Sequence, residues 1–221
     1  LTFCSGGDVA ILGVGVRFPA AVQSGRMASC NAACGVDAIS EIPAARWDLH
    51  IRGGLPEIIL SRLGHTGFVC GAELVDNVAF AISSAETMAM DPCQRLLLEH
   101  GYAALLGASL GRVALSGSLT GVFLGFSGTD FDRVLNEAPT GGSVYSATGS
   151  TSSVASGRLA YTLGMNGPCT SYDTACSAAL VACDAAIHSL LLIRCKDCLA
   201  AGVTPILTPA TSMRFAAAGM I

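Results

Sequence analysis

One cysteine of this chain stands where a nucleophile would be placed. Cys176 follows the short β-favouring stretch 169–173 and precedes a long run of small and apolar residues, 177–192. A strand that turns sharply into a helix lifts the side chain at the corner out of the backbone, as in the nucleophile elbow of hydrolases. The unpaired N–H groups and the positive dipole end of the helix favour a thiolate there. Two interpretations stay open, a nucleophile and a buried structural thiol.

Small residues flank this cysteine and would let another backbone or an acyl chain approach it closely: Ala175, Ser177, Ala178 and Ala179. The histidines offer it no base. None of the four (His50, His65, His100 and His188) has a metal-ligand spacing with another. His188 lies three turns along the expected helix, about 18 Å from Cys176, which is too far for proton transfer.

The remaining thiols are better explained as structural. Cys195 and Cys198 form a lone CxxC pair that precedes a strand, whereas a thioredoxin-like redox motif opens a helix. A zinc site would need Cys30 and Cys34 as its second pair, at an unusual spacing. We therefore interpret both pairs as incidental thiols and expect no bound metal.

Gly13 and Gly15 lie near the end of a candidate strand and invite comparison with dinucleotide-binding loops. The third glycine of that motif is missing, because Phe18 takes its place and Pro19 follows where a helix should begin. We expect instead that the backbone at these two glycines lies close to another part of the chain.

Composition excludes several classes of protein. The chain has 221 residues, of which 52% are hydrophobic and 13% charged, with a net charge of -4. Scattered lysines and arginines and a negative net charge argue against nucleic-acid binding. The longest apolar stretch, 178–193, is broken by Asp184 and His188, so no membrane span is expected. Such a low charged fraction suggests that a partner or more chain covers much of the surface.

Ten cysteines could form a disulfide framework, but such frameworks belong to small secreted chains with poor cores. Many of these cysteines sit inside apolar stretches, as small hydrophobic residues do. No signal peptide is evident, since Asp8 and nearby glycines interrupt the N-terminal apolar run. We expect a reducing, intracellular compartment and, because Leu1 begins the chain, a fragment or processed product.

The elements that must position Cys176 alternate between strands and helices, which predicts an α/β fold. Strands are expected at residues 9–16 and 120–126, which are buried apolar runs, and also at 169–173 and 199–207. Helices are expected at 92–107, capped by Asp91 and Pro92, at 150–163, at 177–192, and from Thr208-Pro209 onward. Ser83 and Glu86 have the spacing of a capping box. Residues 20–74 should be irregular with short helices, and the helix 177–192, apolar nearly all round, should be sandwiched in the interior.

These segments resemble the β-ketoacyl synthase (ketosynthase) domains of type I polyketide and fatty acid synthases, of the thiolase superfamily. The sequence DTACSAAL at 173–180 is similar to the family signature Asp-Thr-Ala-Cys-Ser-Ser-Ser-Leu. Further blocks follow in the family's order: VAILGVGVRFP at 9–19, EIPAARWD at 41–48, MDPCQRLLLEHGYAAL at 90–105, TGVFLGFSGTDF at 120–131, ATGSTSSVASGRLAYTLGMNGP at 147–168, and AAGVTPILTPATSMRFAAAGMI at 200–221. Together they cover nearly the whole chain.

The resemblance implies the N-terminal half of a thiolase-like fold, a mixed sheet with helices on both faces. Residues 1–221 would form a single domain with an irregular helical insertion at about 20–110. It implies that Cys176 accepts an acyl group from a thioester of coenzyme A or of acyl-carrier-protein phosphopantetheine, its own backbone N–H supplying half of the oxyanion hole. A carbanion from a decarboxylated malonyl thioester would then attack that acyl group. The acyl carrier protein is the implied partner, a homodimer the implied assembly, and no permanently bound cofactor is implied.

The family carries two catalytic histidines, a lysine and a glycine-rich loop in a second half that this sequence does not include. We therefore expect a chain that holds the nucleophile but cannot complete condensation, and whether it is itself an enzyme stays open. The alternative is a non-catalytic ketosynthase-like element that acts as a scaffold in a larger assembly; a thiolase-like enzyme without decarboxylation fits the flanking blocks less well. Locally, Cys93 replaces a glutamine of the family motif, and Ala178 and Ala179 replace serines.

Overall fold

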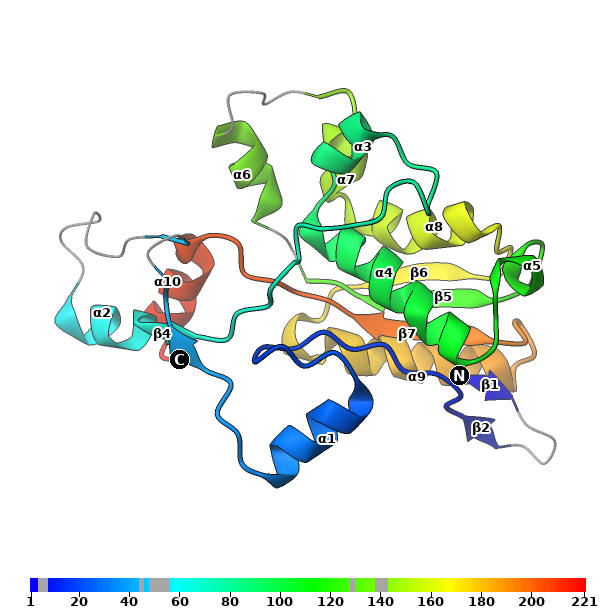
Figure 1. Ribbon diagram of the computed structural model, residues 1–221, viewed down its shortest axis with the longest axis horizontal. Coiled ribbons are helices and arrows are strands. Elements are labelled where there is room, and N and C mark those ends of the chain that lie inside the picture. The colour runs from blue at the N-terminus through cyan, green and yellow to red at the C-terminus, as the bar shows by residue number, and fades with distance from the viewer. Residues whose placement is uncertain (4–7, 44–45, 48–55, 128–129, 138–142) are drawn as a thin grey trace. The chain divides into compact units, whose positions relative to one another are not determined.

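The computed structural model describes residues 1–3, 8–43, 46–47, 56–127, 130–137 and 143–221 (Figure 1). The chain divides into two compact units. The first comprises residues 1–16 and 71–205, and the second comprises residues 17–70 and 206–221. Residues 20–110 contribute to both units, and a single domain with a helical insertion there stays a prediction.

A parallel three-stranded sheet forms the centre of the first unit. Its strands are β5 (Gly121–Gly125), β6 (Cys169–Tyr172) and β7 (Cys198–Gly202), in the order β6-β5-β7. Every residue of β5 is buried, as expected for the middle strand of a sheet covered on both faces. Because the strands run in parallel, their carboxyl ends meet at one edge of the sheet.

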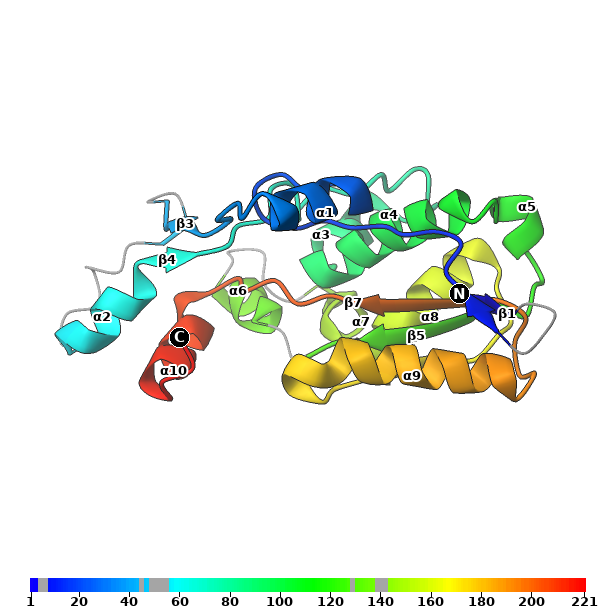
Figure 2. The same ribbon diagram turned by 90° about the horizontal axis from the view of Figure 1, so that it is seen from below.

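Helices cover both faces of this sheet, with α4 and α8 on one side and α9 on the other (Figure 2). The α4–α8 side holds the larger apolar core, in which Leu98, Leu124 and Leu159 are fully buried. The helices of this unit are α3 (Ser84–Met88), α4 (Pro92–Gly107), α5 (Arg112–Leu115), α6 (Phe131–Glu137), α7 (Ser146–Ser150), α8 (Ser152–Leu163) and α9 (Ala178–Leu191). This layered arrangement confirms the predicted α/β class.

The helix starts follow the predicted capping chemistry. The Asp91 carboxylate accepts a hydrogen bond from the Cys93 N–H at 2.6 Å, and Pro92 occupies the first turn of α4. The Ser83 hydroxyl accepts from the Glu86 N–H at 3.2 Å at the start of α3. Only this half of the capping box forms, because the Glu86 carboxylate pairs with Arg158 instead.

Two strands are shorter in the structure than the sequence predicts. Of residues 9–16, only Val9–Ala10 form a strand, β2, which pairs antiparallel with β1 (Thr2–Phe3). Ile11 and Val14 are 69% and 62% exposed, so this apolar run is not a buried strand. Strand β7 ends at Gly202 rather than near residue 207, because its neighbour β5 ends at Gly125, the residue paired with Gly202.

The prediction that Gly13 and Gly15 lie against another backbone is confirmed. A Cβ atom added to Gly13 would lie 2.0 Å from the Ala104 carbonyl oxygen, and one added to Gly15 would lie 2.1 Å from the His100 carbonyl oxygen. Both carbonyls belong to α4. These glycines therefore serve packing against a helix.

Helix α9 differs from the prediction of a helix sandwiched in the interior. Its buried stripe, Ala178, Ala182, Ala186 and Leu190, has i, i+4 spacing and faces the sheet. On its outer side Leu180 is 74% exposed, and just beyond its end Ile193 is 85% exposed. A helix that is apolar all round needs a layer on each side, and the described residues supply only the sheet.

The second unit contains short elements joined by irregular chain, as predicted for residues 20–74. It holds α1 (Gly25–Ala33), β3 (Ser40–Glu41), α2 (Glu57–Leu63), β4 (His65–Thr66) and the predicted last helix, α10 (Pro209–Ala217). Strands β3 and β4 pair antiparallel. The Arg62 guanidinium donates a hydrogen bond to the Ala216 carbonyl at 3.1 Å and thereby joins α2 to α10. No helix in the described part of the chain has the length and apolar character needed to cross a membrane.

Candidate active site

Cys176 lies at the corner between β6 and α9, as the sequence predicts. It occupies a short 3₁₀ turn, Ala175–Ser177, that leads directly into α9. The Asp173 carboxylate accepts a hydrogen bond from the Ala175 N–H at 3.3 Å, and the Ser177 hydroxyl donates to the Thr174 carbonyl at 2.8 Å. Residues on both sides of the cysteine are thus held by local hydrogen bonds.

The backbone immediately before Cys176 is strained. Ala175 has φ = +52°, in the left-handed region that residues with a Cβ atom rarely adopt. This conformation costs an L-residue roughly 1–2 kcal/mol. It produces the sharp turn between strand and helix, and strained backbone of this kind clusters at functional sites.

Two glycines at the carboxyl edge of the sheet allow the start of α9 to pack closely against the strands. A Cβ atom on Gly125, the last residue of β5, would lie 2.4 Å from the Ala179 backbone nitrogen. One on Gly202, the last residue of β7, would lie 2.5 Å from the Ala179 Cβ. The prediction that small residues near Cys176 admit a second backbone is confirmed for Ala179.

Sequence reasoning missed Ser127, which follows β5 by two residues. Its hydroxyl donates a hydrogen bond to the Ala175 carbonyl at 3.2 Å and connects the end of β5 to the corner that carries Cys176. The signal was available in the strand pattern, since side chains that follow neighbouring parallel strands gather at the same edge of the sheet.

The strand that leads to Cys176 is fixed by a polar network that the sequence analysis also missed. The Ser171 hydroxyl donates to the Ser152 carbonyl at 2.7 Å and contacts the Ser156 hydroxyl at 3.0 Å, joining β6 to α8. On the far side of α8, buried Arg158 donates to the Gln94 side-chain carbonyl at 2.7 Å and pairs with Glu86. Gln94 in turn donates to the Gly149 carbonyl at 2.9 Å.

This network fixes α8 from two sides. Its polar residues are widely separated in sequence, so no local sequence pattern indicates that they are in contact. Buried polar groups need such partners, because an unsatisfied one costs about 1–3 kcal/mol.

Exposure separates Cys176 from several other thiols. Cys176 is exposed, whereas Cys93, Cys195 and Cys198 are buried. Burial raises the pKa of the Cys93 thiol, and the nearby Asp91 carboxylate raises it further. Burial likewise raises the pKa of the Cys169 thiol at the start of β6. These thiols are held in the neutral, weakly nucleophilic form.

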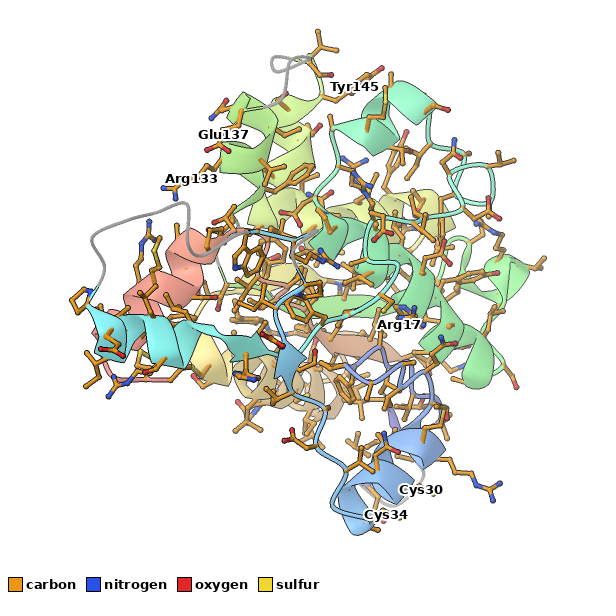
Figure 3. The ribbon with its side chains drawn as sticks, turned by 60° about the vertical axis from the view of Figure 1, so that its left-hand side comes forward. Arg17, Cys30, Cys34, Arg133, Glu137 and Tyr145 are labelled. Carbon is orange, nitrogen blue, oxygen red and sulfur yellow. The ribbon has the colours of Figure 1, made fainter. Side chains whose placement is uncertain are left out.

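His188, Cys195 and Cys198 lie toward the other end of α9 from this corner. His188 is in the last turn of α9 and contacts the Asp184 carbonyl at 3.0 Å, about 18 Å along the helix from Cys176. Cys30 and Cys34 are exposed on and just after α1, in the second unit (Figure 3). His50 lies outside the described residues. Among those described, no group of three or more His, Cys, Asp or Glu side chains is arranged to hold a metal ion.

A family model for the N-terminal domain of β-ketoacyl synthases matches residues 7–221. The chain belongs to this family. Among its relatives, the spectinabilin polyketide synthase system protein NorC of Streptomyces orinoci is 41% identical over 96% of the chain. Polyketide synthase GfsB of Streptomyces halstedii is 42% identical over the same share. The ketosynthase matches span only 9% and 4% of these relatives' own lengths.

Solved ketosynthase structures share the fold. The ketosynthase from module 6 of the bacillaene synthase of Bacillus subtilis superposes with a TM-score of 0.82 at 30% identity, over 96% of this chain and 34% of that one. The oxazolomycin ketosynthase domain from Streptomyces albus gives a TM-score of 0.81 at 27% identity, over 95% and 36%. This chain therefore has a thiolase-like α/β fold and spans about a third of those structures.

Proposed function

We propose that Cys176 is the nucleophile of a polyketide-synthase ketosynthase and accepts an acyl group from a thioester. The observation that carries this proposal is an exposed cysteine on a strained strand-to-helix corner, within a signature that resembles the family's active site. The relatives named above are polyketide synthases by description, which favours polyketide over fatty acid synthesis.

The proposed step is a transthioesterification. The Cys176 sulfur attacks the thioester carbonyl carbon, a new S–C bond forms, and the donor's S–C bond breaks to release its thiol. Negative charge develops on the carbonyl oxygen during the attack. The backbone N–H of Cys176, in the first turn of helical structure, is the donor we assign to that oxygen.

The donors would be acyl thioesters of coenzyme A or of acyl-carrier-protein phosphopantetheine, so an acyl carrier protein is the proposed partner. The acyl group on Cys176 would then be attacked by the carbanion of a decarboxylated malonyl thioester. We further propose a homodimer and a reducing intracellular compartment, which suits the free thiols of the nine cysteines whose side chains are described. No permanently bound cofactor enters this scheme.

Acyl loading tests the assignment. We expect the protein to gain one acyl mass on incubation with an acyl-coenzyme A, and Cys176→Ala to lose that gain, because alanine has no nucleophile. Cys169→Ser is the control and should keep the gain, since Cys169 lies at the start of β6, away from the corner at Cys176. Intact-mass spectrometry reads both variants. Loading that is unchanged in Cys176→Ala contradicts the assignment.

A non-catalytic role is the second candidate, and the exposed apolar residues on and beside α9 favour it. Leu180, Leu192 and Ile193 are 74%, 62% and 85% exposed, which suits a surface that binds another protein layer. The same loading experiment discriminates the two. A folded protein that takes up no acyl group at any cysteine favours the scaffold.

A further inference from the structure

Two cysteines lie in direct contact at the end of α9 opposite to Cys176. Cys195 and Cys198 occupy the turn that leads from α9 into β7, and their Sγ atoms are 2.9 Å apart. Their side chains are only 4% and 2% exposed. The sulfurs of a disulfide lie about 2.05 Å apart, so these two are about 0.9 Å from bonding distance. The sequence alone predicted two incidental thiols, whereas the structure places their sulfur atoms in direct contact.

Helix α9 holds both thiols in place. The Cys195 thiol donates to the Ser189 hydroxyl at 3.2 Å, and the Cys198 thiol lies 3.7 Å from the Ala186 carbonyl oxygen. Apolar side chains surround the pair, including Phe123 of β5 and Leu190 of α9. The two sulfurs are thus positioned by partners outside the CxxC segment.

The turn between the two cysteines is fixed as well. The Asp197 carbonyl accepts from the Gly121 N–H at 2.9 Å, and the Asp197 carboxylate accepts from the Thr2 hydroxyl at 2.7 Å. Cys198 begins β7 and pairs with Gly121 in the parallel ladder. Because the backbone is held on both sides, the remaining gap between the sulfurs has to close by rotation of the two side chains.

We propose that Cys195 and Cys198 form an oxidation site that reacts with hydrogen peroxide and closes to an intramolecular disulfide. One sulfur attacks a peroxide oxygen, the O–O bond breaks, and hydroxide leaves to give a sulfenic acid. The second sulfur then attacks the first, the S–S bond forms, and the S–O bond breaks. In total, two thiols and one peroxide give one disulfide and two waters; the thiols lose two electrons and the peroxide gains them.

Peroxide suits this site because it is small, and the pair has almost no exposed surface. Burial raises the pKa of the Cys198 thiol, and the adjacent Cys195 raises it further. The thiolate is the reactive form. Disulfide formation is therefore slow at neutral pH and accelerates as pH rises.

Peptide mapping of the full chain tests the site. Trypsin cleaves after Arg194 and after Lys196, so it separates the two cysteines, and only a disulfide keeps their peptides joined. After peroxide treatment of the folded protein, we expect the peptide 197–214 to carry the dipeptide 195–196, with a mass about 2 Da below the sum of the two reduced peptides, since disulfide formation removes two hydrogens. Reduction before digestion should release the dipeptide.

Two comparisons make the test specific. Cys195→Ser and Cys198→Ser should each abolish the linked peptide, whereas Cys34→Ser, on the exposed pair next to α1, should leave its yield unchanged. The same oxidation in urea should give a mixture of cysteine pairings. The proposal is overturned if peroxide leaves residues 195 and 198 unlinked in the folded wild-type protein, or if folded and urea-treated samples give the same mixture.

Discussion

The residue just before Cys176 determines the position of the Cys176 thiol. Ala175 carries the left-handed backbone angle that turns β6 into α9, and its carbonyl accepts the Ser127 hydroxyl. The side chain at this position must therefore be small enough to tolerate positive φ. A branched side chain would favour another backbone conformation and move the thiol.

We expect Ala175→Val to lower the free energy of unfolding by about 1–3 kcal/mol, because a β-branched residue is a strained occupant of the left-handed region. Acyl loading at Cys176 should fall in the same variant. Ala175→Gly is the matched control and should stay within about 1 kcal/mol of the wild type, since glycine adopts positive φ readily. Urea unfolding measures both. Equal stability of the valine and glycine variants would argue against backbone strain at this corner.

At the scale of elements, the packing of α9 against the sheet depends on the two glycines that end β5 and β7, Gly125 and Gly202. Gly125 leaves no room for a Cβ beside the Ala179 backbone nitrogen. We expect Gly125→Ala to destabilise the protein by about 1–3 kcal/mol, as overpacking does, and to reduce acyl loading by displacing the start of α9. Thermal unfolding and intact mass report the two effects.

Gly157 provides the control for that substitution. It lies inside α8, and a Cβ added there meets no atom within 4 Å. Gly157→Ala should therefore raise stability by up to about 1 kcal/mol through helix propensity. If Gly125→Ala were equally well tolerated, the close packing of α9 against β5 would not be what positions Cys176.

The elements with local signals were predictable from sequence. The α4 start follows from Asp91 and Pro92, and the α8 end follows from Gly164, whose φ is +71°. Strand β5 follows from its apolar run, and β6 and the corner at Cys176 follow from a β-favouring stretch that precedes small and apolar residues. The length of β7 was not predictable, because it depends on where its partner β5 ends. The exposed outer side of α9 was missed for a similar reason, since burial depends on layers far away in sequence.

The central residue of the candidate site was predictable from the sequence, whereas the residues that support it by hydrogen bonds were not. Cys176 was identified by its place between strand and helix and by its motif. Arg158 and Gln94 were not, because their hydrogen bond joins segments that are distant in sequence. Ser127 was missed although its place just after β5 is a signal that the strand pattern offers. The contact between Cys195 and Cys198 was also missed, since a CxxC spacing alone does not tell how the two side chains point.

At the scale of the whole molecule, buried thiols make stability depend on pH. The pKa values of Cys93 and Cys198 are raised above the ordinary thiol value by burial. Above pH 9 the unfolded chain loses these protons while the folded chain keeps them, so the folded state is stabilised below that pH and loses stability above it. Each group contributes a slope of up to about 1.4 kcal/mol per pH unit.

We therefore expect the free energy of unfolding to fall between pH 9 and pH 11, and to fall less steeply in Cys93→Ala. Cys30→Ser, an exposed thiol, should retain the wild-type slope. Urea unfolding across this pH range, under reducing conditions, provides the comparison. A slope unaffected by Cys93→Ala would mean that this thiol does not contribute to the pH dependence.

The most direct test of the central claim is a site-resolved map of acylation on the wild-type protein. After incubation with an acyl-coenzyme A, peptide mass spectrometry should find the acyl group on Cys176 and on no other of the ten cysteines. Buried Cys93, Cys195 and Cys198 and exposed Cys30 serve as internal comparisons in the same sample. An acyl group spread over the exposed cysteines according to their accessibility, or absent from Cys176, would contradict the assignment of this residue as the nucleophile.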